Sequence, residues 1–254
     1  MYTLKKSLGQ HFLKDETICR RIVDSLTECP FHNLLEVGPG GGALTKHLLQ
    51  LPNVAFKAVE LDDEKVVFLK KTYPVLVGKI IHQSFLDIAK PFDEAFTVVG
   101  NFPYNISTQI LFKILDWNDS VPCAVGMFQK EVAQRIAAAH GNKVYGVTSV
   151  LVQAFYQVDY LFDVGEDSFT PPPKVKSGVI RLTRRKEPLA TKSRAAFFTL
   201  VKTAFNQRRK TLRNACKSLF DSGTLGEEIF NQRAEQLSIE DFALLSYKMT
   251  DENS

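Results

Sequence analysis

A short apolar run followed at once by a glycine-rich turn is the feature that most limits how this chain can fold. Residues 34–37 are typical of a buried strand, the next five are Gly38-Pro39-Gly40-Gly41-Gly42, and a helical pattern covers residues 43–51. Glycines in such a turn let the backbone approach a ligand closely. The sequence therefore predicts a strand–turn–helix unit that holds a cofactor.

Further apolar runs alternate with helical patterns along the first 180 residues. Predicted strands cover residues 54–59, 79–82, 96–99, 123–128, 158–164 and 178–182. This alternation favours an α/β fold with a doubly wound, mostly parallel sheet. Glu60 directly follows the strand predicted at 54–59. It lies twenty-two residues after Gly38, near the spacing at which an acid binds a ribose.

The sequence Asn101-Phe102-Pro103-Tyr104 follows the strand predicted at 96–99, where open α/β sheets bind their ligands. Asn101 offers a neutral carbonyl oxygen to an amine, and Pro103 holds Phe102 in an extended conformation that orients its carbonyl. Tyr104 offers a flat face for a base. The set suits methylation of an exocyclic amine on a planar base, although a simple strand-to-helix turn also uses proline and asparagine.

The glycine spacing alone does not choose the cofactor. Gly38, Gly40 and Ala43 satisfy the dinucleotide pattern, so the loop is compatible with NAD. Pro39 and Gly42 tighten the turn without any need to cradle a pyrophosphate, and the Asn-Phe-Pro-Tyr motif has no use in hydride transfer. S-adenosylmethionine is therefore the predicted cofactor.

Positive charge is concentrated in one part of the chain. Residues 181–217 contain twelve Lys and Arg against one acid, whereas residues 218–254 contain eight acids against two basic residues. A cationic band in an otherwise balanced protein indicates a polyanionic partner, although a solvated basic face has the same composition.

The rest of the composition is that of a globular protein, with 44% hydrophobic and 24% charged residues among 254. No apolar run reaches membrane-spanning length, so we expect a cytoplasmic protein without a membrane partner. Cys19, Cys29, Cys123 and Cys216 lie far apart without metal-ligand spacing. We expect four buried thiols and no metal site.

A series of motifs resembles the ribosomal RNA small-subunit adenine N6,N6-dimethyltransferase family. The motifs are Leu8-Gly-Gln-His-Phe-Leu13, Glu36-Val-Gly-Pro-Gly40, Val59-Glu-Leu-Asp62, Asn101-Phe-Pro-Tyr-Asn-Ile-Ser107, Gln129-Lys-Glu-Val132, residues 169–177 and Ala204-Phe-Asn-Gln-Arg-Arg-Lys-Thr-Leu-Arg-Asn214. The resemblance covers nearly the whole chain. It implies a Rossmann-like class I methyltransferase sheet, mostly parallel with an antiparallel last strand, and a small all-helical C-terminal domain.

The same resemblance implies roles for individual residues. His11 and Leu13 are expected to contact S-adenosylmethionine from the N-terminal segment, and Gly38 to meet its methionine end. Glu60 is expected to hold the ribose hydroxyls, and Asn101 to lie between the cofactor and the target.

One position departs from the family pattern. Where an acid usually binds the amine of the cofactor's adenine, this chain has Ser84, whose hydroxyl can accept the same hydrogen bond without charge. Asp87 is the alternative candidate. We expect somewhat weaker cofactor binding and retained activity.

The motif suggests a mechanism. The Asn101 side-chain oxygen and the Phe102 carbonyl accept hydrogen bonds from both N–H groups of the target adenine, so that its lone pair faces the methyl group. Tyr104 and Phe169 are the candidates for stacking a flipped base, although Phe169 fits a core aromatic beneath the proline-rich loop equally well.

The chain is predicted to divide near residue 186. Residues 1–186 form a catalytic domain with a basic N-terminal lid segment, and residues 187–254 form a helical RNA-binding domain. A predicted helix over 205–217 places Arg209, Arg213 and Lys217 on one face. The predicted RNA-binding residues are Lys5, Lys6, Arg208, Arg209, Lys210, Arg213 and Lys217.

By this resemblance, the predicted reaction is dimethylation of N6 on two adjacent adenosines near the 3′ end of 16S ribosomal RNA. The expected partner is the pre-30S particle, and the expected enzyme is a monomer. Three alternatives stay open: a ribosome-assembly binding factor with secondary methylation, an adenine methyltransferase of large-subunit RNA, and an NAD-dependent oxidoreductase.

Overall fold

The computed structural model describes residues 11–29 and 32–250. Backbone packing divides the chain into two compact units. The sheet unit takes the described residues up to Ala133 together with Asp159–Arg184, and the helical unit takes Gln134–Val158 together with those from Arg185 onward. One boundary of this division, between residues 184 and 185, lies two residues from the predicted one. Residues 134–158, however, group with the helical unit.

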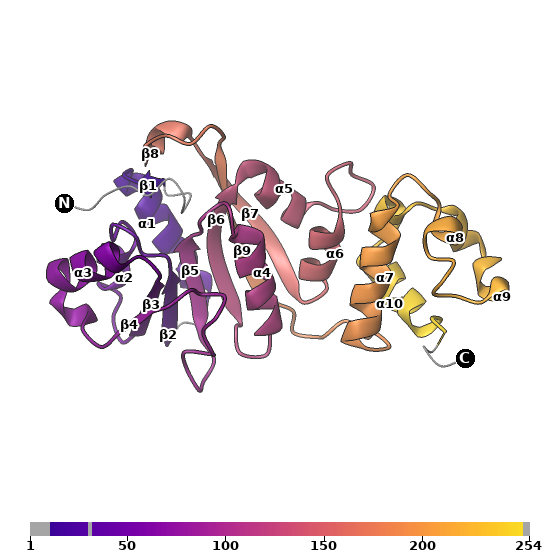
Figure 1. Cartoon of the computed structure of the whole chain (residues 1–254), viewed down its shortest axis with the longest axis horizontal. Coiled ribbons are helices and arrows are strands. Elements are labelled where there is room, and N and C mark those ends of the chain that lie inside the picture. The colour runs from indigo at the N-terminus through magenta and orange to yellow at the C-terminus, as the bar shows by residue number, and fades with distance from the viewer. Residues whose placement is uncertain (1–10, 30–31, 251–254) are drawn as a thin grey trace. The chain divides into compact units, whose positions relative to one another are not determined.

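Seven strands form the main sheet in the order β4-β3-β2-β5-β6-β9-β7 (Figure 1), and all of their residues except 156–158 of β7 belong to the sheet unit. Their bounds are β2 Asn33–Val37, β3 Ala55–Glu60, β4 Ile80–His82, β5 Thr97–Asn101, β6 Cys123–Gln129, β7 Tyr156–Val164 and β9 Ser177–Arg184. The pairs among β4, β3, β2, β5 and β6 are parallel, whereas β9 pairs with β6 in the antiparallel sense. The predicted mostly parallel sheet with an antiparallel last strand is confirmed.

The register of the parallel strands brings their carboxyl ends to one edge of the sheet. Val37 at the end of β2 lies opposite Val59 of β3, and Glu60 lies opposite His82 at the end of β4. The residues that follow these strands therefore face a common space, as expected for parallel pairing.

Short helices connect these strands. They are α1 Glu16–Asp24, η2 Ser25–Glu28, α2 Thr45–Leu48, α3 Asp63–Thr72, η3 Pro74–Leu76, α4 Ser107–Asp116, α5 Lys130–Ala137 and η4 Glu166–Ser168. Asp15 caps α1, accepting from the backbone N–H of Thr17 at 2.9 Å. Ser107 is the first residue of α4, and its hydroxyl donates to the Tyr104 carbonyl at 3.2 Å.

A small antiparallel pair joins two segments that the sequence did not connect. Strand β1 (Phe12–Leu13) pairs with β8 (Phe169–Thr170), where an extended proline-rich loop was predicted. Leu13 and Phe169 both lie in the hydrophobic core. The pairing is not visible in the sequence because its two partners are more than 150 residues apart.

The helical unit is built around α7 (Arg194–Asn206), which packs against α6 (Val147–Gln153), α8 (Leu212–Ala215) and α10 (Ile239–Tyr247). The other elements are α9 Ser222–Leu225, η5 Glu228–Asn231 and η6 Ala234–Gln236. The continuous helix predicted over 205–217 is wrong. The backbone leaves the helix after Asn206, because Thr211 bridges to Arg233 and Leu212 donates its N–H to Gln232.

The expectation of four thiols is also wrong. Cys29, just after η2, and Cys123, at the start of β6, are joined by a disulfide with a Cα–Cα distance of 5.7 Å. Cys19 and Cys216 are buried free thiols, and burial raises the pKa of Cys19 to about 11. Within residues 11–29 and 32–250 the structure shows no helix that could cross a membrane and no cluster of His, Cys, Asp or Glu able to hold a metal.

Two strand glycines make room for the ring of Phe102. A methyl group at Gly126 on β6 would lie 2.3 Å from Phe102 Cε2, and one at Gly100 on β5 would lie 2.8 Å from Cε1. The ring is 1% exposed and packs edge-on against Phe128 with ring centroids 5.2 Å apart. Packing against the sheet therefore holds Phe102, the residue after Asn101, in place.

Gly126→Ala tests this packing. We expect a loss of about 1–3 kcal/mol in unfolding free energy, because the added methyl group overpacks the Phe102 ring. Urea denaturation measures the effect, and the double variant with Phe102→Leu should lose less than the sum of the two single losses. Additive losses would show that Gly126 and Phe102 are not coupled.

Candidate functional site

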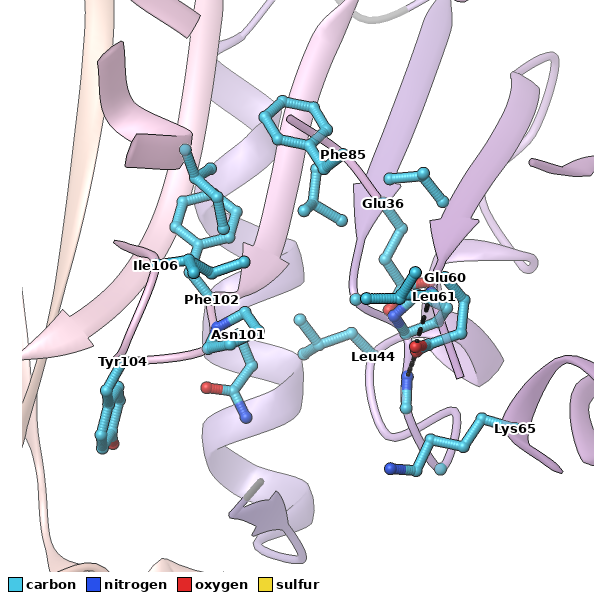
Figure 2. Close-up of a pocket in the computed structure, with 18 of the residues that line it drawn as sticks. Glu36, Leu44, Glu60, Leu61, Lys65, Phe85, Asn101, Phe102, Tyr104 and Ile106 are labelled. Carbon is cyan, nitrogen blue, oxygen red and sulfur yellow. Dashed lines mark hydrogen bonds between the residues drawn. The ribbon is translucent and has the colours of Figure 1, made fainter. Parts of the chain in front are cut away.

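A cavity of about 310 Å³ opens at the carboxyl edge of the parallel strands (Figure 2). It is lined by the glycine loop 38–41, by Glu60 and Leu61 at the end of β3, by residues 83–86 after β4 and by residues 101–106 at the end of β5. The volume is in the range of small-molecule sites. Strand β1 closes another side with His11, Phe12 and Leu13.

The glycine loop owes its shape to backbone conformations that favour glycine. Gly38 has φ +68° and Gly40 has φ +54°, both in the left-handed region. Gly38 donates its N–H to the Val59 carbonyl at 2.9 Å, which ties the loop to β3. A methyl group at Gly40 would lie 3.2 Å from the Phe12 ring, so the loop also needs glycine to fit under β1.

Glu60 is fixed by the backbone around it. Its carboxylate accepts hydrogen bonds from the N–H groups of Gly40 at 3.0 Å, Leu61 at 2.9 Å and Asp62 at 3.0 Å. A carboxylate offers about four acceptor positions, so one is left for a hydroxyl group in the cavity. The predicted ribose ligand therefore has the capacity for its role.

Glu36 is a second acid on the cavity wall, to which the sequence analysis gave no role. It is 1% exposed and accepts a hydrogen bond from the Thr45 hydroxyl at 2.7 Å. Burial raises the pKa of the Glu36 carboxyl to about 8, although the Thr45 bond works in the opposite direction. The group is therefore largely protonated at neutral pH.

Asn101 holds its side-chain amide in one orientation. Its Nδ2 donates to the His11 carbonyl at 3.2 Å, and Figure 2 shows its oxygen turned toward Tyr104. Figure 2 shows Asn101 and Tyr104 on one side of the cavity, with Glu36 and Glu60 on the other. The amide oxygen therefore lies on the Tyr104 side of the cavity.

Tyr104 and His11 form a pair of rings beside Asn101. Their centroids are 5.7 Å apart with an interplanar angle of 29°. The Tyr104 hydroxyl is hydrogen-bonded to Ser177, and His11 Nδ1 donates to the Pro171 carbonyl at 2.9 Å. The His11 ring is therefore held by the residue after β8, and the Tyr104 ring by the first residue of β9.

Phe169 does not join these rings. Its side chain is 1% exposed and belongs to the hydrophobic core, and it does not line the cavity. The predicted stacking role is wrong in this structure, because pairing of β8 with β1 turns the ring into the core. The core reading given in the sequence analysis is the correct one for this residue.

The two candidates for the adenine amine are placed differently. Ser84 lines the cavity, but its Oγ accepts the backbone N–H of Leu86 at 3.2 Å within its own turn. Asp87 is exposed and is not among the lining residues. Of the residues named from sequence, His11, Leu13, Gly38, Glu60, Ser84 and Asn101 all line one cavity.

Lys65 is a lining residue that the sequence did not reveal. Its side chain is 1% exposed, and its ammonium group lies 4.0 Å from Asp62 Oδ2 and 4.6 Å from the centroid of the Phe12 ring. Val67, on the same helix, is 66% exposed although it is hydrophobic. No local sequence pattern distinguishes a buried lysine from an exposed one in a charged helix.

The predicted RNA-binding residues that can be described belong to the helical unit. They do not lie on one helix face, because the backbone turns between α7 and α8. Arg208 is paired with Glu235 at 2.9 Å, and Arg213 donates to the Leu225 carbonyl at 2.9 Å. Arg209, Lys210 and Lys217 are exposed. Lys5 and Lys6 lie outside the described residues.

Comparison with known proteins gives consistent results. The family model described as ribosomal RNA adenine dimethylase matches residues 1–251. A protein of Cytophaga hutchinsonii named ribosomal RNA small subunit methyltransferase A is 52% identical over 242 residues, 94% of each chain. A protein of the same name from Flavobacterium johnsoniae is 51% identical over 96% of this chain and 95% of its own.

Solved structures resemble this one over most of its length. The crystal structure of a dimethyladenosine transferase from Plasmodium falciparum matches with a TM-score of 0.77 and 25% identity, covering 93% of this chain and 95% of its own. The 23S rRNA methyltransferase ErmE matches with a TM-score of 0.73 and 23% identity, covering 94% and 99%. At this identity ErmE shows a common fold only.

Glu36→Gln should alter how stability depends on pH. Because the Glu36 pKa rises from its ordinary value of 4.5 to about 8 on folding, the folded protein holds one more proton between these values. The wild type should lose stability as pH rises through this window, by up to about 1.4 kcal/mol per pH unit. Urea denaturation of cofactor-free protein should show this loss reduced in Glu36→Gln. Equal slopes for both proteins between pH 5 and pH 8 would contradict a buried, protonated Glu36.

Proposed function

The chain belongs to the ribosomal RNA adenine dimethylase family, and from this membership we propose that it dimethylates N6 of adenosine in small-subunit ribosomal RNA, using S-adenosylmethionine. The observation that carries the proposal is the Asn101 amide, whose nitrogen is bonded to His11 and whose oxygen is left for the target amine. The finer expectations are two adjacent adenosines near the 3′ end of 16S RNA, a pre-30S substrate, a cytoplasmic location and a monomer.

The cavity residues fit S-adenosylmethionine. Gly38 and Gly40 have no side chains, so a ligand can come close to the backbone of their loop. Glu60 has one acceptor position free for a ribose hydroxyl. The cofactor supplies an electrophilic methyl group on a sulfonium. Glu36 and Glu60 place two acids near a ligand that is cationic, while the protonated state of Glu36 limits the cost of burying it.

Asn101 and Phe102 position the target amine. The N6 lone pair of adenine is delocalised into the ring, so the amine is a poor nucleophile. Hydrogen bonds from its two N–H groups to the Asn101 oxygen and the Phe102 carbonyl favour the tetrahedral form. Both acceptors are fixed before the base arrives, one by His11 and the other by the buried Phe102 ring. Such preorganised dipoles supply much of the acceleration in many enzymes.

The chain needs no strong base for this step. The methylated amine is an acidic ammonium that loses its proton readily to water. A second transfer leaves one N–H to be held and requires space for the first methyl group. Tyr104 provides a face on which the flipped base can stack, and its hydroxyl bond to Ser177 keeps the ring in place.

The exposed basic residues of the helical unit suit the RNA backbone. Arg209 and Lys210 are exposed in the turn between α7 and α8, and Lys217 follows α8. Arg208, in contrast, is already paired with Glu235. Cations of this kind position RNA through its phosphates and do not read its sequence. Large-subunit RNA is the rival substrate, and the fold shared with ErmE does not choose between them.

Asn101→Ala tests the proposed reaction. Wild-type protein incubated with labelled S-adenosylmethionine and undermodified small ribosomal subunits should yield N6,N6-dimethyladenosine in digested small-subunit RNA. The variant should lose about 100- to 1,000-fold in rate, because it loses one of two acceptors for the amine. Its affinity for S-adenosylhomocysteine should stay within threefold of wild type, which serves as the control for folding.

Large ribosomal subunits provide the second control. Label confined to large-subunit RNA would overturn the substrate assignment and leave the methyltransferase fold intact. Full turnover by Asn101→Ala would overturn the mechanism. Tight binding to the small subunit without any methyl transfer would favour the assembly-factor alternative.

The double variant Arg209→Gln with Lys210→Gln tests the basic surface. Each phosphate contact contributes about −0.7 to −0.9 to the slope of log affinity against log salt, so the slope should become shallower by roughly 1.5 if both residues meet phosphates. The matched control is Lys70→Gln with Lys71→Gln on α3, which removes the same charge from exposed positions in the sheet unit. Filter binding at several salt concentrations gives both slopes. Identical changes in the two double variants would indicate a net-charge effect without a specific surface.

A further inference from the structure

Resting on the proposed function, we propose that Gln83 recognises the adenine edge of the cofactor, in a chain that has Ser84 where an acid is expected. Gln83 follows β4 directly and lines the cavity. Neither candidate from sequence analysis, Ser84 or Asp87, meets the requirements of this role as well.

The order of the strands places Gln83 where the base of a bound nucleoside is expected. Strands β2, β3 and β4 are neighbours in this order, and they carry Gly38, Glu60 and Gln83 immediately after or at their ends. Neighbouring strands are about 4.8 Å apart. A nucleoside whose ribose reaches Glu60 on β3 therefore extends its base toward the end of β4.

The cavity wall at this end is apolar, as a base requires. Leu61 follows Glu60 and is 54% exposed although it is a large hydrophobic residue, and Phe85 is a buried ring on the same cavity. Ile106 completes this part of the lining, opposite Leu61 in Figure 2. An exposed leucine on a cavity wall is suited to contact with the face of a flat base. The polar edge of that base then has to meet a polar side chain from the β4 loop.

The β4 loop offers two polar side chains, of which Gln83 has the greater free capacity. The Ser84 hydroxyl is engaged with the backbone N–H of Leu86 in its own turn. Within residues 11–29 and 32–250, the Gln83 amide has no hydrogen-bond partner. Asp87 donates its own N–H to the Ser84 carbonyl in this turn and its side chain stays outside the cavity.

A side-chain amide carries both a hydrogen-bond donor and an acceptor, as the adenine edge does. The adenine edge presents an amine donor next to a ring nitrogen acceptor. The Gln83 amide provides an oxygen that accepts from the amine and an NH₂ that donates to the ring nitrogen, the bidentate pattern by which glutamine and asparagine read adenine. A carboxylate satisfies only the amine. The chain can therefore dispense with an acid at position 84 and still select adenine.

The test is calorimetric binding of two neutral ligands, S-adenosylhomocysteine and its analogue without the 6-amino group. Gln83→Met keeps the length of the side chain and removes both hydrogen-bonding ends. We expect it to weaken binding of S-adenosylhomocysteine about tenfold and that of the analogue by less than threefold. Ser84→Ala and the matched control Asp87→Asn, from the same turn, should each change the affinity for S-adenosylhomocysteine by less than threefold.

Each other outcome overturns the inference in a distinguishable way. Equal losses for both ligands in Gln83→Met would give that residue a packing role only. A tenfold loss in Ser84→Ala with unchanged binding in Gln83→Met would transfer the role to Ser84. Wild-type protein that binds neither ligand would remove the proposed function itself, and the inference with it.

Discussion

Parallel pairing of β5, β2, β3 and β4 is the constraint on which the rest of this structure depends. Hydrogen bonding in register brings the ends of these strands to one edge, with a spacing set by the sheet. Asn101, Gly38, Glu60 and Gln83 therefore follow one another across that edge, in the order that we propose for target, methionine, ribose and base. The chemical order of the proposed site is thus the order of the strands.

Packing beneath the motif separates its chemical groups from its structural ones. Phe102 contributes its carbonyl to the proposed chemistry, whereas its ring is a structural element seated over Gly100 and Gly126. Asn101 contributes its amide oxygen because the nitrogen is already bonded to His11. Acceptors held this way need no reorganisation when a base arrives, and this is what makes a neutral amide effective in catalysis.

The two acids of the cavity show how the same residue type can serve different ends. Glu60 is surrounded by three backbone N–H donors, which suit a charged carboxylate. Glu36 has one hydroxyl donor and is fully enclosed, so burial raises its pKa to about 8. The first acid is able to accept from a ligand hydroxyl. The second is a largely neutral part of the wall at physiological pH.

The sequence by itself determined the strands, the glycine turn and the placement of Glu60 and Asn101 at strand ends, because hydrophobic period and turn chemistry are local properties. Only the tertiary structure decided that Phe169 is core, that Lys65 is buried, that Cys29 meets Cys123 and that the helix breaks after Asn206. Each of these depends on contacts between distant segments: His11 and Pro171, whose hydrogen bond helps to hold β1 beside β8, are 160 residues apart. The role proposed for Gln83 also depends on the tertiary structure, because only the order of the strands places this glutamine beside the proposed ribose site.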